Sequence, residues 1–490
     1  MASATFQQAE RKQLSVLTAL DKMVLAPLPR AGRRSASSRQ HLSGNSNAAR
    51  AAGVTYPAFH PRRDIRVAPI ILSMSILESM NMQNEPRYLS ARQAASTLGV
   101  TLPTLYAYTS RSQIHSEPVP GRPRERRYFR EDIERLRLRK EARRDPDRAV
   151  ARGLNWGSPV LDSAITLIHD GKLYYRGQDV TKLARTATLE QLAALLWSAD
   201  SAELERRFDQ DCPLTSRQIF HLRTSTAEPL PLMQAALPVA CANDPVGYDL
   251  RPPAVRQTGA RIIRLLTTTI AGRTRAPVHL ALQTAWAPKM PEIAEAIRAA
   301  LVLCADHELN VSAFTARCAA SAGASPYDVV AAAMATLKGR RHGGETERAT
   351  ALFQEVGTPQ RAPRVLAGRL RRGERIPGFG HRLYPNGDPR AAVLLRLAQA
   401  YGKRTDYRLV RSLSQAGAEL LQEIPNLDFG LAALAQTCRL PAGAPLILFA
   451  MGRTVGWIAH AIEQYATGDL IRPRARYTGS APVYSNASEP

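Results

Sequence analysis

The stretch PGFGHRLYPNGDPRA, residues 377–391, carries the most information in the chain. It places His381 just after Gly378 and Gly380, and it places Arg390 directly after a proline. Glycine lets the backbone approach a ligand closely and adopt positive φ, so a histidine beside it is less typical of a purely structural residue. Arginine has a planar fork of donors that pairs with both oxygens of a carboxylate. The stretch therefore predicts part of a site for a small anion.

Segments on both sides of this stretch repeat the same residue types. His307 lies in ADHELN, residues 305–310, and His342 lies in GRRHGG, residues 339–344. Toward the C-terminus, an isolated acid or arginines occur in PNLDF with Asp428, GRTVGWIAH with Arg453 and IRPRARYTG with Arg472. Three histidines, one acid and several arginines are suited to fixing a small polyanion and moving a proton.

These six segments, taken in order, resemble the motifs of the citrate synthase family, and the resemblance covers residues 155–480. Six motifs in one order are far more specific than any single motif. The resemblance implies a mainly α fold, in which a large and a small helical domain close over the active site. It also implies a dimeric enzyme that joins an acyl-CoA thioester to oxaloacetate, the condensation that opens the tricarboxylic acid cycle.

The resemblance implies a role for each matched residue. His342 would polarise the thioester carbonyl, Asp428 would remove a proton from the acyl α-carbon, and His381 would hydrogen-bond the ketone oxygen of oxaloacetate. A carboxylate needs such help, because a thioester α-proton is very weakly acidic unless the enolate is stabilised as it forms. No metal or cofactor is implied beyond the acyl-CoA substrate. The oxaloacetate carboxylates would be held by His307, Arg390, Arg453 and Arg472, the last from the second subunit of a homodimer.

The CoA site is less specific in the sequence. The family holds the adenine largely by backbone near the third histidine, and cations nearby would meet phosphates. The residues expected there are Pro377, Gly378, Gly380, Lys338, Arg341 and Arg375. The chain departs from the family pattern after His-Gly-Gly, where Glu345 and Thr346 replace Ala-Asn. No residue indicates whether acetyl-CoA, giving citrate, or propionyl-CoA, giving 2-methylcitrate, is used; the family as a whole favours acetyl-CoA.

A basic module precedes the matched region. Residues 1–150 contain 26 Lys and Arg against 13 Asp and Glu, which is more than half of the net charge of +24. Residues 87–145 predict a helix over 91–98, a Gly99 break, a second helix capped by Thr101, a β-wing and a third helix. Basic modules of this kind have anionic partners.

The order of these elements resembles the winged helix-turn-helix of MerR-type regulators. The resemblance implies that the wing residues Arg124, Arg126 and Arg127 meet DNA phosphates. The second helix reads Leu105-Tyr106-Ala107-Tyr108 and lacks the arginine that the family has there. Two alternatives to a DNA-binding enzyme stay open: a structural or protein-docking module, and a metabolite-sensing regulator that binds CoA or oxaloacetate.

The remaining segments are predicted to be connections. Residues 1–86 are a basic, disordered tail, or lie upstream of a true start at Met74, Met80 or Met82; residues 146–154 are a linker and 481–490 a tail. Five scattered cysteines without a CxxC pair indicate a reducing cytoplasm and no zinc site. No apolar run reaches the ~18 residues of a membrane span. The nearest, residues 445–460, is interrupted by Arg453 and predicts a buried helix.

Overall fold

The computed structural model describes the chain from residue 88 to residue 480 with several gaps, and the predicted tails (1–86, 481–490) and linker (146–154) lie outside it. The described residues fall into two compact units that meet in sequence between Asp162 and Ser163. Those described are 88–111, 113–119, 122–130, 132, 133, 136, 137, 161–208, 212–226, 228–272, 275–475 and 477–480, with the backbone alone at 122–124 and 205.

The smaller unit contains a three-stranded antiparallel sheet and two helices. Its sheet has the strand order β1-β3-β2. Its elements are β1 (Tyr88–Ser90), α3 (Ala91–Leu98), α4 (Leu102–Ser110), β2 (Ser116–Val119) and β3 (Arg122–Phe129). The two helices, the break between them and the β2–β3 hairpin agree with the ranges expected from the sequence. Of the third predicted helix only residues 130, 132, 133, 136 and 137 are described, all helical.

Local signals determine the helix ends of this unit. Ser90 and Gln93 form a capping box at the start of α3, and Gly99 ends the helix in the left-handed conformation. Thr101 precedes α4, but its hydroxyl contacts that of Thr104 at 2.9 Å and makes no bond to the helix backbone. Thr101 therefore occupies the expected N-cap position, but its side chain does not cap the helix. The core of the unit is Leu89, Ala94, Ala95, Leu98, Leu105, Ile114, Tyr128 and Ile133.

The larger unit begins with a small sheet of β4 (Thr166–His169), β5 (Lys172–Tyr175) and β6 (Gln178–Asp179). Asp170 and Gly171 both have positive φ, 49° and 70°, between β4 and β5. Two successive residues of positive φ match the twist of a tight antiparallel hairpin. The hairpin predicted from Asp-Gly is confirmed.

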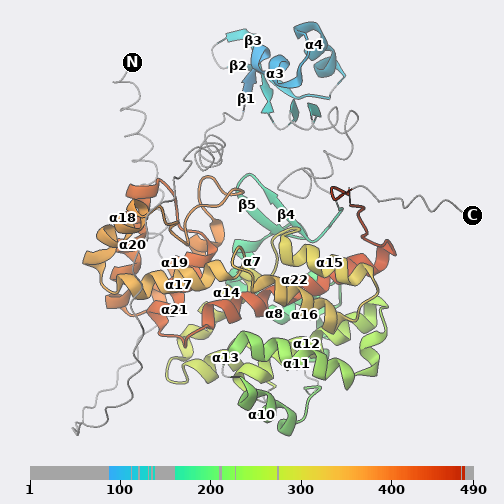
Figure 1. Ribbon diagram of the computed structural model, residues 1–490, viewed down its shortest axis with the longest axis vertical. Coiled ribbons are helices and arrows are strands. Elements are labelled where there is room, and N and C mark those ends of the chain that lie inside the picture. Colours follow the sequence, from blue (N-terminus) through green and yellow to red (C-terminus); the bar gives the residue numbers. More distant parts are fainter. Residues whose placement is uncertain are drawn as a thin grey trace, which may run out of the picture. The chain divides into compact units, whose positions relative to one another are not determined.

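Helices make up most of the larger unit, in two groups (Figure 1). The first group packs around the long helix α22 (Ala444–Thr467). Its other helices are α7 (Val180–Thr186), α8 (Leu189–Leu196), α9 (Ser201–Phe208), α10 (Ser216–Ser225), α11 (Pro229–Ala242), α12 (Pro252–Ala271), α13 (Val278–Trp286), α14 (Ala294–Cys304), α15 (Val311–Ser321) and α16 (Pro326–Leu337), with the 3₁₀ turns η2 (Pro245–Tyr248) and η3 (Pro291–Ile293).

The second group of helices lies between residues 344 and 438, and its members pack largely on one another. It contains α17 (Gly344–Val356), η4 (Pro359–Arg361), α18 (Ala362–Arg371), α19 (Pro389–Tyr401), α20 (Arg404–Leu421) and α21 (Leu427–Cys438). Helix α17 also contacts α22, so the two groups meet there. The mainly α fold expected from the sequence is confirmed.

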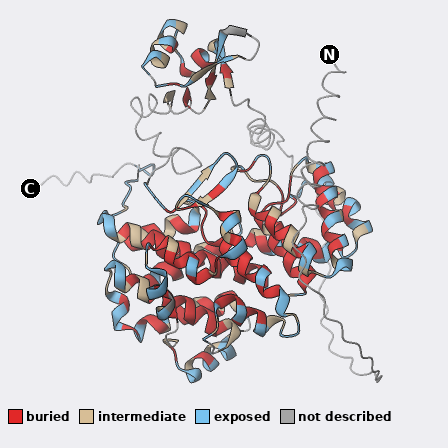
Figure 2. Cartoon of the chain, turned by 180° about the vertical axis from the view of Figure 1, so that it is seen from behind, coloured by how far each residue is buried: buried red, intermediate tan, exposed pale blue. Residues whose placement is uncertain are grey.

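Helix α22 is the centre of the first group. It is long and apolar enough to cross a membrane, but 94% of its apolar window is buried inside the unit, which identifies a core helix. Figure 2 shows how strongly burial is concentrated within the helices of this unit. Gly452 and Gly456 bring α22 against the end of α14, because an added Cβ would lie 2.4 Å from Leu301 O and 2.3 Å from Ala305 O. The predicted buried helix with one internal charge, Arg453, is confirmed.

Candidate active site

Six of the residues predicted from the sequence are supplied by helix ends, turns and one helix centre of the larger unit. The first group of helices contributes His307, which follows α14, His342, between α16 and α17, and Arg453, in the middle of α22. The second group contributes His381, before α19, Arg390, in the first turn of α19, and Asp428, in the first turn of α21.

Two histidines from different groups lie against each other beside Tyr384. The ring centroids of His307 and His381 are 5.1 Å apart, and Nε2 of His307 is 3.0 Å from the Tyr384 hydroxyl. Burial, helped by Arg390, lowers the pKa of His381 to about 4 and holds the pKa of His307 well below its ordinary value. Both rings are therefore neutral near pH 7. The backbone N–H of Leu383 donates to Nδ1 of His381 at 3.2 Å, which leaves the His381 proton on Nε2.

Arg390 is fixed by a buried carboxylate. Its Nε and one terminal nitrogen donate to the two oxygens of Asp388 at 3.0 and 2.8 Å. Asp388 also accepts from the backbone N–H of Arg390 at 3.0 Å and from that of Leu427 at 3.1 Å, so it joins the starts of α19 and α21. Burial alone raises the pKa of Asp388, but the adjacent Arg390 outweighs burial and holds the pKa below its usual value. The pair is therefore ionised and fixed.

Glycines bring the loop before α19 close to the loop before α21. Gly378 has φ +87° and Gly380 has φ +69°, and a Cβ on these residues would lie 3.0 Å from Phe429 and 2.7 Å from the Glu423 carboxyl carbon, respectively. Asn426 donates from Nδ2 to the Gly380 carbonyl at 3.1 Å. The positive φ values favour glycine at both positions, and Asn426 ties the loop that carries His381 to the start of α21.

Asp428 lies where α17 and α21 meet. Oδ1 of Asn426 caps α21 by accepting from the backbone N–H of Asp428 at 3.0 Å. The hydroxyl of Thr346 donates to Oδ1 of Asp428 at 2.5 Å. Burial raises the pKa of Asp428 to about 6; the Thr346 hydrogen bond acts against this rise and the charge of Glu345 adds to it. A carboxylate with this pKa is ionised at neutral pH and basic enough to act as a general base.

His342 is oriented by a chain of hydrogen bonds from α22. Its Nε2 lies 2.8 Å from the hydroxyl of Ser312, which accepts from the indole N–H of Trp457 at 3.1 Å. Burial, followed by the charge of Arg453, lowers the pKa of His342 to about 3, so the ring is neutral. The one hydroxyl proton of Ser312 has two acceptors within reach, Nε2 of His342 and Oδ1 of Asn310, each at 2.8 Å. With that proton directed at Nε2, the His342 proton lies on Nδ1 and is available to a ligand.

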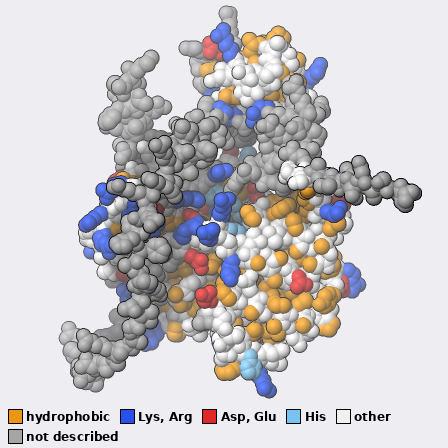
Figure 3. All heavy atoms as spheres, in the orientation of Figure 1, with side chains coloured by type: hydrophobic (Ala, Val, Ile, Leu, Met, Phe, Trp, Pro, Cys, Tyr) orange, Lys and Arg blue, Asp and Glu red, His pale blue; other side chains and the backbone are white. Residues whose placement is uncertain are grey.

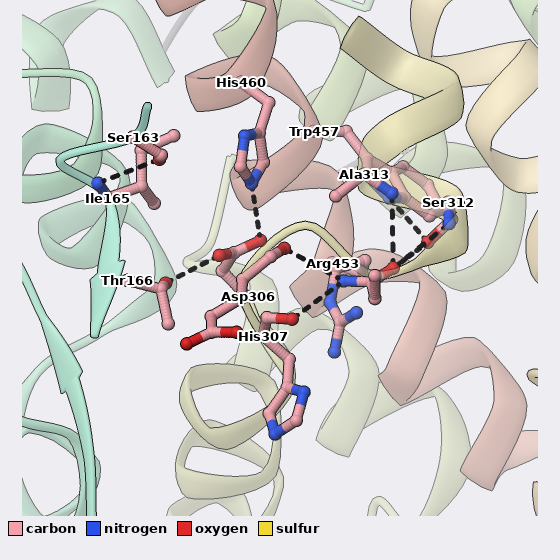
Figure 4. A network of polar contacts seen from close by, with 12 residues as sticks. Ser163, Ile165, Thr166, Asp306, His307, Ser312, Ala313, Arg453, Trp457 and His460 are labelled. Carbon is pink, nitrogen blue, oxygen red and sulfur yellow. Dashed lines mark hydrogen bonds and ion pairs between the residues drawn. The ribbon is translucent and has the colours of Figure 1, made fainter. Parts of the chain in front are cut away.

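Arg453 and His460 on α22 fasten the segment that carries His307 (Figure 4). Nε of Arg453 donates to the Cys304 carbonyl at 2.7 Å, and its terminal nitrogens point away from the drawn contacts. Asp306 lies between His460, whose Nε2 is 3.3 Å from Oδ1, and Thr166, whose hydroxyl donates to Oδ2 at 2.6 Å. The guanidinium of Arg453 is thus held through Nε, and its terminal N–H groups remain available to a ligand.

Comparison with known proteins identifies the family to which this arrangement belongs. The family model described as the C-terminal domain of citrate synthase matches residues 153–474. The chain belongs to the citrate synthase family. "Citrate synthase 2" of Bacillus subtilis is 30% identical over 359 residues, which are 67% of this chain and 96% of that protein. A "2-methylcitrate synthase" of Mycobacterium tuberculosis is 30% identical over 334 residues, 63% of this chain and 84% of that protein.

Solved structures of citrate synthases share the fold. That of Thermoplasma acidophilum, a ternary complex with carboxymethyl coenzyme A and oxaloacetate, has a TM-score of 0.60 at 25% identity and covers 68% of this chain and 97% of its own. The structure of the Thermotoga maritima citrate synthase has a TM-score of 0.58 at 25% identity and covers 67% of this chain and 96% of its own. As a member of this family the chain is an enzyme, a transferase.

The other predicted residues lie beyond α22, in the segments next to His342 and His381, or in the smaller unit. Arg472 is exposed beyond the end of α22 and makes no contact with the site in the part of the single chain that the structure describes. Among the residues expected at CoA, Pro377 and Gly378 are buried in the loop before His381, Gly380 is half-buried, and Lys338, Arg341 and Arg375 are exposed. Figure 3 shows Lys and Arg side chains gathered on one part of the visible face of this unit.

In the smaller unit, two predicted DNA contacts have partners in their own sheet. Arg126 donates to the hydroxyl and the carbonyl of Ser116 at 2.8 and 2.9 Å. Arg127 is paired with Glu117, with Nε 2.7 Å from Oε1, and its guanidinium lies 4.0 Å from the ring centre of Tyr88. The side chain of Arg124 lies outside the described residues.

Several residues of the site were missed in the sequence. Asp388 before Pro389, and Asn426 two residues before Asp428, stand at helix starts, and a search for N-cap residues would have found both. Ser312 and Trp457 carry no local signal, because their partners are distant in sequence. Tyr384, Asp306 and the role of Thr346 were also missed.

The pair of Asp388 and Arg390 makes a stability prediction. Asp388→Asn keeps the volume but leaves the buried Arg390 without a negative partner, and we expect it to lower the free energy of unfolding by about 3–5 kcal/mol. Urea unfolding measures the change. The control is Asp249→Asn, which removes the partner of the exposed Arg251 and should leave the unfolding midpoint nearly unchanged. Equal midpoints for the two variants would contradict the assignment.

Proposed function

We propose that the chain condenses acetyl-CoA with oxaloacetate to give citrate and free CoA. The observation that carries this proposal is one half-buried carboxylate, Asp428, which Thr346 holds through a single oxygen in a unit that also supplies neutral histidines and two buried arginines. This set matches what a carbon–carbon condensation needs: a base, donors for two developing oxyanions, and cations for a dicarboxylate. The carboxymethyl coenzyme A and oxaloacetate of the Thermoplasma complex support the same substrates.

Oxaloacetate would bind first to the cations. Arg390 and Arg453 are both buried, and a bound carboxylate would meet two guanidiniums already held in place by Asp388 and by the Cys304 carbonyl. His307 would complete this set from beside Tyr384. Arg472, exposed in the single chain, would reach the site of the partner in a homodimer. Binding would fix the ketone carbon in place, which removes much of the entropic barrier to reaction.

The enolisation step uses Asp428 and His342. The carboxylate of Asp428 takes a proton from the acyl α-carbon, and the C–H electron pair becomes the carbon–carbon double bond of the enolate. The thioester oxygen that gains this charge accepts a hydrogen bond from neutral His342. Preorganised donors of this type stabilise an oxyanion most strongly where water is excluded.

The condensation step uses His381. The enolate carbon attacks the ketone carbon of oxaloacetate, and the ketone oxygen becomes an alkoxide that accepts the Nε2 proton of His381. Water then hydrolyses the thioester of the citryl-CoA product, releasing citrate and the CoA thiol. Because His381 has a low pKa, it donates as a neutral ring and recovers its proton from the medium.

The choice of acyl group stays open between acetyl-CoA and propionyl-CoA. The two thioesters differ by one methylene, which a pocket distinguishes by only ~1–3 kcal/mol. One relative at 30% identity is named citrate synthase and another at 30% is named 2-methylcitrate synthase. We propose acetyl-CoA as the preferred substrate and 2-methylcitrate synthesis as the alternative.

Release of the CoA thiol tests the proposal. We expect release with acetyl-CoA that requires oxaloacetate and is faster than with propionyl-CoA. Asp428→Ala should lose at least about 10³-fold in kcat, since the base is removed. Folded wild-type protein that binds oxaloacetate but releases no thiol from either thioester would contradict the enzyme and favour a metabolite sensor.

DNA binding by the smaller unit is a second candidate function. Its support is the helix, glycine turn, helix and hairpin of residues 88–129, which resemble a MerR-type winged helix-turn-helix. The partners of Arg126 and Arg127 within the sheet count against a simple phosphate role for these residues. We expect the full chain to be retained on duplex DNA at ~50 mM salt and released at ~200 mM, because phosphate contacts weaken steeply with salt. No retention at the lower salt would exclude this function.

A further inference from the structure

Thr346 is buried and directs its hydroxyl away from its own helix. It is the third residue of α17 and has no exposed surface. A threonine within a helix commonly donates to the carbonyl four residues earlier. Here that carbonyl belongs to His342 and accepts the backbone N–H of Glu345 at 2.9 Å, while the Thr346 hydroxyl donates to Asp428 on α21. The hydroxyl therefore joins two helices at the reacting carboxylate.

This hydrogen bond makes the two oxygens of Asp428 different. Oδ1 accepts the Thr346 hydroxyl at 2.5 Å, whereas Oδ2 accepts no hydrogen bond from the described residues. A carboxylate held through one oxygen presents the other with its lone pairs uncommitted. We propose that Thr346 is a positioning residue that presents Oδ2 of Asp428 to the acyl α-carbon, and that Glu345, the residue before it on α17, places a second negative charge near the same carboxylate.

The start of α17 is built to place these residues. His342 and Thr346 are four residues apart around the same turn, so one helix end carries both the enolate donor and the residue that orients the base. Gly343 permits the tight turn between them, because a Cβ there would lie 2.6 Å from the Leu337 carbonyl. A small shift of this turn would move both groups together, which keeps their spacing fixed.

Glu345 brings a second carboxylate close to the base. Its side chain is mostly buried and is paired with Arg348, which also donates to the Arg340 carbonyl at 2.6 Å. The charge of Glu345 raises the pKa of Asp428, whereas the Thr346 hydrogen bond lowers it. The other charged or titratable groups near Asp428 are Arg390, which lowers its pKa, Asp388, which raises it, and the thiol of Cys304.

The proposal rests on the proposed function, in which the α-proton passes to Asp428. With Oδ1 committed to Thr346, the new O–H bond forms on Oδ2 as the C–H bond breaks, and the electron pair of that bond moves into the enolate. The proton later leaves Oδ2 to solvent, which restores the carboxylate. Atoms and charges balance without any further reactant.

The two residues can be tested by variants with opposite effects. Thr346→Val keeps the shape and removes the hydroxyl, so we expect kcat to fall about tenfold or more and the acidic limb of the pH–kcat profile to rise by on the order of one pH unit. Thr346→Ser keeps the hydroxyl and should stay near wild type. Glu345→Gln should move the acidic limb to lower pH. KM for oxaloacetate should change in none of them.

A second readout separates this proposal from the proposed function. The melting temperature is measured from pH 4 to pH 8 for each protein and for the same protein carrying Asp428→Asn, and the difference isolates ionisation of Asp428. A carboxyl whose pKa is raised by folding loses stability as pH rises from its unfolded value, about 4, to its folded value. We expect this loss of stability to continue to a higher pH in Thr346→Val and to be complete at a lower pH in Glu345→Gln.

The outcomes are distinct. An active wild-type enzyme with unchanged pH limits and unchanged melting differences in Thr346→Val would overturn the role of Thr346 alone. A wild-type chain that releases no CoA would contradict the proposed function, while the melting differences would still decide whether Thr346 and Glu345 control Asp428. A similar loss of kcat in Thr346→Ser and Thr346→Val would also overturn the proposal, because the hydroxyl would then not be the cause.

Discussion

Arg453 places a guanidinium in the middle of a 24-residue apolar helix, and the rest of the site is arranged around that buried charge. It forms no ion pair with any described carboxylate; its Nε bonds the Cys304 carbonyl and its guanidinium lies 4.8 Å from the ring centre of Phe449. A buried charge without a partner is costly, so burial lowers its pKa. In the proposed reaction a dicarboxylate substrate would supply the missing partner. Gly452 and Gly456 are the condition for this arrangement, since only glycine lets α22 approach the segment that ends in His307.

Burial and the two arginines together set the charge state of the histidines. Burial, helped by Arg390, lowers the pKa of His381, and burial, helped by Arg453, lowers that of His342, so both rings are neutral. Asp428 is shifted the other way by burial. Titratable groups whose environments push their pKa values apart are typical of acid–base sites. Both groups of helices contribute to the site: the first carries His342 and Arg453, and the second carries Asp428.

The sequence predicted the mainly α fold, the Asp-Gly hairpin, the buried α22 helix and six residues that helix ends, turns and one helix centre of the larger unit supply. Most of those residues stand in segments that contain Gly, Pro or Asn, and these residue types predict turns and helix caps from local sequence alone. What the sequence could not supply were contacts between distant segments, such as Thr346 with Asp428 and Ser312 with His342, because tertiary packing alone decides them. Thr101 stands at the N-cap position of α4, but its hydroxyl contacts the nearby hydroxyl of Thr104 instead of the helix backbone, and the residue types alone do not decide between these two local partners.

In the proposed reaction, Asp428 removes the α-proton after a dicarboxylate has bound to Arg453 and Arg390. Exchange of the thioester α-protons with solvent tests this most directly. The wild-type protein is mixed with acetyl-CoA in D₂O and with malate, which has a hydroxyl where oxaloacetate has the reacting ketone. NMR then follows deuterium entering the acetyl methyl group. We predict exchange that requires malate and disappears in Asp428→Asn. Exchange that persists in Asp428→Asn, or none in wild-type protein that binds both ligands, would contradict the account.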